Sequence, residues 1–157
     1  MRRVTRLAGL VVVVCAIGMA SPTVVDTVAA DAPACGEVMY DGSGDANDPY
    51  EIENVSQLQC IEQKGLDAHY ELVSDVSASD TQSWNEGKGF DPIGECTGVD
   101  GKKPWHECGG QQFTGTFDGN SHTVSGLTIN RPDTNGTGLF AAADEAQFTN
   151  LRLTSVN

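Results

Sequence analysis

The chain has 157 residues, a length that suits one domain, and its 22 acidic against 9 basic residues give a formal charge of −13. Such a surface repels phosphate, which argues against a nucleic-acid partner and against docking on an anionic membrane. Hydrophobic residues make up 39% of the chain, enough for a small core, so ordinary disorder is disfavoured.

Residues 1–30 resemble a secretory signal peptide. Three arginines precede an apolar run from Leu7 to Met19, which is too short for a membrane-spanning helix of about 20 residues. Small residues allow cleavage after Ala20 or Ala30, and we favour Ala30. The Arg2-Arg3 pair also resembles a twin-arginine signal, although an ordinary signal is favoured. We therefore expect a secreted or cell-surface protein with no membrane span in the mature chain.

The acidic residues are spread along the chain, and lysine is scarce. An evenly acidic, lysine-poor surface is similar to that of proteins from extreme halophiles. Molar salt shortens the Debye length to about 3 Å and so removes self-repulsion. The alternative is an acidic secreted protein from an ordinary environment, and we favour the halophilic interpretation.

Cysteine usage agrees with export. Cys15 lies in the signal, and the cysteines that remain are Cys35, Cys60, Cys96 and Cys108. An even number outside the cell predicts two disulfides. Three pairings are open, and sequence proximity favours Cys35–Cys60 and Cys96–Cys108. A zinc site built from Cys96, His106 and Cys108 is the alternative for the second pair, but it lacks a clear fourth ligand.

Residues 31–76 are expected to form an N-terminal segment with one short capping helix. The helix is predicted over residues 57–63, with Ser56 as its cap and Gly65 as its end. Leu58 and Ile61 would lie on its buried face.

A turn-rich stretch over residues 41–49 precedes this helix and places oxygen-bearing side chains at alternate positions. If it bound calcium, the ligands would be Asp41, Ser43, Asp45 and Asn47. Ala46 and Ile52 stand where such a loop needs glycine and a bidentate glutamate, so a structured turn is the favoured interpretation.

Residues 77–112 are predicted to be a loop-rich insertion that carries the second cysteine pair, whereas residues 113–157 are predicted to contain short strands and tight turns. Leu127 and Ile129 recur as Leu151 and Leu153, 24 residues later. A period in the low twenties indicates a solenoid whose coils stack and bury their inward aliphatic side chains. We therefore expect Leu127 to stack on Leu151 and Ile129 on Leu153.

Several spaced fragments resemble the GLUG-motif proteins, which are repetitive surface proteins of bacteria and archaea. The fragments are Phe90-Asp-Pro-Ile-Gly94, Phe113-Thr-Gly-Thr-Phe-Asp-Gly-Asn120, Thr123-Val-Ser-Gly-Leu-Thr-Ile129 and Gly138-Leu-Phe140. The resemblance implies an all-β fold, a short right-handed parallel β-helix, with coils over residues 113–157. It also implies extracellular binding, adhesion or envelope roles, and it supplies no catalytic residues. With the acidic surface, it suggests a haloarchaeal-like member.

An enzyme is considered because parallel β-helices also host polysaccharide lyases and hydrolases. Asp91 and Asp118 are the best-placed carboxylates for glycoside hydrolysis, but both stand in turn contexts that explain them. Trp84 and Trp105 could present flat faces to sugars, although a structural role is favoured. We therefore predict no catalytic residue, no cofactor and no resident metal.

The function predicted from the sequence is that of a structural or adhesive surface domain without catalytic activity. The alternative is a carbohydrate-binding module or a polysaccharide-active β-helix enzyme. Expected partners are a cell-envelope protein or polysaccharide. The strand pattern at the C-terminal coil has no capping helix, so either its edge pairs with another chain or the chain is a shortened relative of a longer surface protein, and we favour the second interpretation. Two Asn-X-Ser/Thr sequences make Asn54 and Asn135 candidates for glycosylation.

Overall fold

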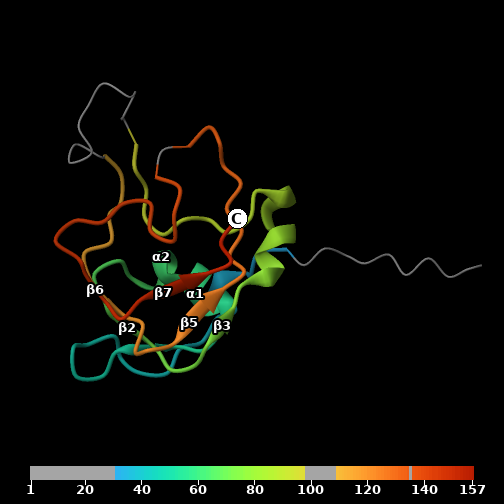
Figure 1. Cartoon of the computed structure of the whole chain (residues 1–157). Helices are drawn as coiled ribbons and strands as arrows, with labels where there is room; N and C mark the ends of the chain where they lie inside the picture. Colours follow the sequence, from blue (N-terminus) through green and yellow to red (C-terminus); the bar gives the residue numbers. More distant parts are fainter. Residues whose placement is uncertain (1–30, 98–108, 135) are drawn as a thin grey trace, which may run out of the picture.

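The structure is a computed structural model that describes residues 31–97, 109–134 and 136–157. The expected signal peptide lies outside the described residues. The described chain consists of short strands and loops with a few short helices (Figure 1). Its strands are β1 (Tyr50–Ile52), β2 (His69–Leu72), β3 (Val76–Ser77), β4 (Thr116–Asp118), β5 (Thr123–Ser125), β6 (Gln147–Thr149) and β7 (Arg152–Thr154). Its helices are η1 (Cys35–Glu37), α1 (Val55–Gln59), α2 (Ile61–Lys64) and η2 (Ser79–Gly87).

The strands form two sheets in which every pair is parallel. The first sheet has the order β1-β2-β4-β6, and the second has the order β3-β5-β7. From β2 onward, successive strands alternate between the two sheets, so each sheet is built from segments far apart in the sequence. The predicted all-β class is confirmed, and the parallel pairing agrees with the expectation from the sequence.

The register of the first sheet places four aromatic residues in one line, which we call the aromatic column. Tyr50 is paired with Tyr70, Tyr70 with Phe117, and Phe117 with Phe148. Tyr70 and Phe117 are almost fully buried. Phe113 joins the column from the side, with its ring centroid 6.2 Å from that of Tyr70 and 5.7 Å from that of Phe148. The column therefore runs through all four strands of this sheet.

The second sheet carries a matching aliphatic line. Val76 is paired with Val124, and Val124 with Leu153. Val76 and Val124 are buried in the same core cluster as Tyr70 and Phe117. Side chains of a strand point alternately to its two faces, so each short strand of the second sheet has one residue of this line on its inner face. These residues pack the second sheet against the core that it shares with the first sheet.

The expected 24-residue stacking is wrong. Leu153 is paired with Val124 rather than with Ile129, and the backbone next to Leu127 belongs to Asn157, whose N–H donates to the Leu127 carbonyl at 3.0 Å. The recurrence misled because the register of parallel strands follows the alternation of inward side chains. The loops between those strands differ in length, so no constant period links the paired strands.

The capping helix is present but is divided and begins earlier than expected. Asn54, rather than Ser56, is its N-cap: the Asn54 side chain accepts from the Gln57 N–H, and the Gln57 side chain accepts from the Asn54 N–H. This reciprocal pair is a capping box, which satisfies two backbone donors at once. Gly65 ends α2 as predicted, and Leu58 and Ile61 are fully buried.

Close backbone contacts with the neighbouring chain segments surround β4. A Cβ atom at Gly115 would lie 1.9 Å from the Ala68 carbonyl oxygen, and one at Gly119 would lie 2.3 Å from that of Asn150. Only glycine fits where two backbones approach this closely. The Asn150 side-chain amide also donates to Asp118 at 2.9 Å, so the turn after β4 is tied to the turn after β6.

The first predicted disulfide is confirmed. Cys35 and Cys60 are bonded, with a Cα–Cα distance of 5.3 Å, and the bond joins the N-terminal segment to the end of α1. Cys96 is also disulfide-bonded. Its expected partner Cys108 and the alternative zinc ligand His106 lie outside the described residues.

The segment after β3 contributes to the main core. Trp84, Phe90 and Ile93 belong to the same buried cluster as the two lines of inward residues. The Phe90 N–H donates to the Thr128 carbonyl at 2.8 Å, and the Ile93 N–H donates to that of Leu139 at 2.9 Å. Residues 84–93 are therefore packed and hydrogen-bonded against the C-terminal half of the chain.

The aromatic column gives a test of the core. We expect Phe117→Ala to lower the free energy of unfolding by about 3–5 kcal/mol, because a fully buried ring leaves a cavity. Phe148→Ala is the matched control, since the same ring at the next register position is 40% exposed. Urea unfolding should show the smaller loss for Phe148→Ala, and equal losses would contradict the packing described here.

The Cys35–Cys60 bond gives a second test. Replacing both cysteines with alanine should lower the free energy of unfolding by about 2–4 kcal/mol, because the cross-link restricts the unfolded chain. Thermal unfolding with and without reductant measures the effect, and reductant should leave the double variant less affected than the native chain. No loss of stability on replacement would show that the bond does not stabilise the fold.

Candidate functional site

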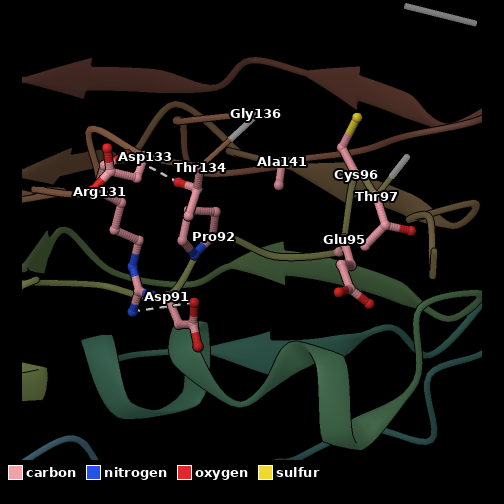
Figure 2. Close-up of a pocket in the computed structure, with 11 residues that line it drawn as sticks. Asp91, Pro92, Glu95, Cys96, Thr97, Arg131, Asp133, Thr134, Gly136 and Ala141 are labelled. Atoms are coloured by element: carbon pink, nitrogen blue, oxygen red, sulfur yellow. Dashed lines mark hydrogen bonds and ion pairs between the residues drawn. The ribbon is translucent and has the colours of Figure 1, made fainter. Parts of the chain in front are cut away.

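A crevice of about 390 Å³ opens between the segment that follows η2 and the loop between β5 and β6 (Figure 2). Residues between Asp91 and Thr97 supply one wall, and residues 131, 133, 134, 136 and 141 supply the other. The lining side chains are mostly polar, namely Asp91, Glu95, Thr97, Arg131, Asp133 and Thr134, with Pro92, Cys96 and Ala141 among them.

Arg131 is the basic side chain among the described residues that line this crevice, and it is held by two contacts. Its guanidinium lies 3.1 Å from an Asp91 carboxylate oxygen, and its Nε donates to the Phe90 carbonyl at 3.2 Å. The Arg131 side chain is 16% exposed, whereas that of Asp91 is 63% exposed. The pair thus fastens the loop after β5 to the segment after η2, and Figure 2 shows the two side chains pointing toward each other.

Asp91 is also fixed through its backbone. The Gln59 side-chain amide donates to the Asp91 carbonyl at 3.0 Å and accepts from the Asp91 N–H at 2.9 Å. Helix α1 therefore positions the wall of the crevice, and the contacts of Asp91 give it a structural role.

A group of carboxylates lies on the α2 side of the crevice. The pKa of Glu62 is raised, first by burial and then by the negative charges of Asp91 and Glu95, while a hydrogen bond from the Gly94 N–H opposes the rise. The arrangement concentrates negative charge beside Arg131. Among the described residues, no three histidine, cysteine or acidic side chains are grouped closely enough to hold a metal ion.

The two carboxylates considered for glycoside hydrolysis have different surroundings. Asp91 lines the crevice, but Asp118 does not. Asp118 accepts from the Asn120 N–H at 2.8 Å and from the Asn150 amide, and these bonds lower its pKa. The hydrogen bond from the Asn120 N–H is the Asx-turn contact that the sequence predicted for Asp118.

The aromatic residues considered as sugar platforms do not line this crevice in the described part of the chain. Trp84 is 3% exposed and packs in the main core, which fits the structural role favoured for it. Trp105 lies outside the described residues. The polar side chains that line the crevice can form hydrogen bonds with the hydroxyl groups of a sugar. Trp84 is buried in the core and does not stack on such a ligand.

The stretch considered as a calcium loop forms a compact turn. The N–H groups of Ser43 and Gly44 both donate to the Asp48 carbonyl, and the Asp48 N–H donates to that of Asp45. The Ser43 hydroxyl lies 3.3 Å from Asp45 Oδ2. The structured turn is present, and calcium binding through Asp41, Ser43, Asp45 and Asn47 stays a prediction.

The glycosylation candidates differ in what the structure describes. Asn54 is exposed, and its side-chain oxygen caps α1, whereas Asn135 lies outside the described residues. Modification at either position stays a prediction. Arg131 and Asp133 were not singled out from the sequence, although the scarcity of basic residues in so acidic a chain was a signal that could have drawn attention to Arg131.

Comparison with known proteins places the chain beside two much longer relatives. It is 38% identical over 112 residues to halomucin of Haloquadratum walsbyi, a match that covers 69% of this chain and 1% of halomucin. It is 31% identical over 121 residues to a protein of Evansella cellulosilytica provisionally named a Gly-rich membrane protein, covering 74% of this chain and 12% of that protein. The chain thus spans a small fraction of each relative.

Other comparisons gave no match. No family model matches the chain, and no solved structure matches it. The GLUG assignment therefore stays a prediction. Within the described residues, no helix has the length and apolar character needed to cross a bilayer.

The charge beside the crevice gives a pH-dependent prediction. Because the pKa of Glu62 is raised in the folded protein, stability from this group is present below the unfolded pKa of about 4.3 and is lost as pH rises through the folded value. We expect Glu62→Gln to stabilise the protein at neutral pH, with a difference that shrinks toward about pH 4.

Urea unfolding of the two proteins across this pH range measures the difference. Glu37→Gln is the control, since Glu37 is an exposed glutamate in η1. A destabilising effect of Glu62→Gln at neutral pH would contradict the unfavourable charge environment.

Proposed function

We propose that the chain is a secreted or cell-surface structural domain, with an adhesive role and no catalytic activity, built as a short right-handed β-helix. The similarity to halomucin, a protein named as a mucin, over 69% of the chain carries this proposal. The Cys35–Cys60 bond supports it, because disulfides persist in oxidising compartments outside the cytosol. The second relative, named as a membrane protein, agrees with a place at the cell envelope.

The β-helical part of the proposal rests on strand connectivity. Strands that alternate between two parallel sheets are what a chain produces when each coil contributes one strand to each face. The inward lines of the two sheets meet in one core cluster, as stacked coils require. A β-helix also suits a structural role at a surface, because its coils present a regular exterior without demanding a pocket.

The acidity of the chain fits a halophilic setting. At low ionic strength, a net charge of −13 destabilises a compact fold through self-repulsion, and salt screens that repulsion. The folded protein would then be more stable at molar salt than at low ionic strength.

A second candidate is the binding of a cell-envelope polysaccharide at the crevice. Its support is the concave surface on which a fixed guanidinium, carboxylates and threonine hydroxyls meet, because such groups bind sugar hydroxyls. An Arg131→Gln variant would lose this binding in calorimetric titrations with envelope polysaccharide. Unchanged titration curves would remove the crevice from consideration.

The surface location can be tested directly. Protease treatment of intact cells should digest the protein, and antibodies raised against it should label unpermeabilised cells or detect it in the medium. A cytosolic protein of the same organism serves as the control that must stay intact. Detection only in the cytosol would overturn the proposal.

The halophilic setting can be tested on the purified protein. We expect the melting temperature to rise by several degrees from low to molar sodium chloride, because screening removes repulsion among carboxylates. A variant with several exposed aspartates changed to asparagine should need less salt for the same stability. Equal salt dependence of the two proteins would contradict charge screening as the cause.

A further inference from the structure

The outer edge of the two sheets exposes an apolar surface that we call the end face, defined by residues 147–157. Phe148, Leu153 and Val156 are 40%, 37% and 49% exposed on it. Phe148 is paired with Phe117 and Leu153 with Val124 on the preceding strands. Phe117 and Val124 are fully buried, so the same positions in this fold are normally covered. Phe148 and Leu153 therefore occupy inward positions that lack a covering layer among the described residues.

The end face also presents two strand edges. β6 and β7 are the outermost strands of the two sheets. The Gln147 N–H and the Thr149 carbonyl bond toward β4, and the Thr154 carbonyl bonds toward β5. Alternate residues of a parallel strand bond to opposite neighbours, so the backbone polar groups of Phe148 and Leu153 point toward the open edge. Such edges are templates for pairing with another chain.

The charge of the end face indicates which kind of partner can bind there. Residues 147–157 contain a single charged side chain, Arg152, although the whole chain carries a net charge of −13. The nearest acidic residues along the sequence, Asp144 and Glu145, precede β6. The end face is therefore a neutral to slightly positive patch on a strongly acidic molecule, where another acidic chain can approach with least repulsion.

We propose that the end face binds the end face of a second copy of this chain. One two-fold axis across this end brings the same patch of two copies together, so both pairs of edges and both sets of apolar side chains are covered in a closed dimer. Phe148, Leu153 and Val156 then lie at the centre of the interface. The proposal stands independently of the surface location and of any ligand at the crevice.

Sedimentation velocity of the purified protein in molar salt tests the interface. We expect the native protein to be a dimer whose population falls as salt is lowered, since long-range repulsion between acidic copies is then less screened. Leu153→Asp should weaken self-association by about ten-fold or more, because an unpaired carboxylate would be buried. Val156→Asp provides a second variant at the most exposed of the three positions.

Met39→Asp is the matched control. Met39 is an exposed apolar residue, 82% accessible, outside the end face, and its change alters the net charge by the same amount. Thermal unfolding of each variant checks that the fold is retained. A native protein that is monomeric in molar salt, or forms open-ended assemblies, would overturn the proposal. So would a dimer that survives both end-face changes or is lost equally with Met39→Asp.

Discussion

The structure depends on one packing constraint, namely that each short strand directs at least one large apolar side chain inward, next to the inward side chain of the strand paired with it. Tyr50, Tyr70, Phe117 and Phe148 follow one another in this way through the first sheet, and Val76, Val124 and Leu153 do so through the second. Strands of two to four residues cannot be stable alone. They persist because the column behind them is continuous and because parallel ladders join every neighbour.

The surface follows a different rule from the core. Its acidic residues are distributed along the chain, whereas its few basic residues include Arg131, which fastens two loops at the crevice through Asp91 and the Phe90 carbonyl. The Arg131–Asp91 ion pair therefore stabilises the crevice locally. Repulsion among the acidic residues destabilises the whole fold, and salt screens that repulsion. At the crevice, Arg131 lies among carboxylates, whereas residues 147–157 of the end face carry no acidic side chain.

Local chemistry could be predicted from the sequence, and register could not. The Gly65 helix end, the buried Leu58 and Ile61 and the Asx turn at Asp118 follow from short-range spacing. The Cys35–Cys60 pairing was favoured by sequence proximity among three open pairings. The pairing of Val124 with Leu153 depends on the lengths of the loops between paired strands, which differ along the chain, so a constant 24-residue period gave the wrong partner. The helix cap was misplaced because Ser56 and Asn54 are both good caps, and the reciprocal contact with Gln57 decides between them.

The residues of the crevice could not be predicted from the sequence for the same reason, because they come from distant segments. Asp91 stood out in the sequence as a carboxylate near a motif, but its contacts with Arg131 and Gln59 link segments about 30 to 40 residues apart. No local pattern contains that information. Asp91 holds the segment after η2 to the loop after β5 because the fold brings Arg131 beside it.

The register of the second sheet provides the most direct test of this account. Cysteines placed at Ser125 and Thr154, which are paired on neighbouring strands, should be joined by a short thiol-specific cross-linker and detected as one cross-linked peptide by mass spectrometry. Cysteines at Ser125 and Thr149 follow the 24-residue period instead and should remain unlinked. Cross-linking of the second pair and not the first would contradict the stacked parallel arrangement on which the account rests.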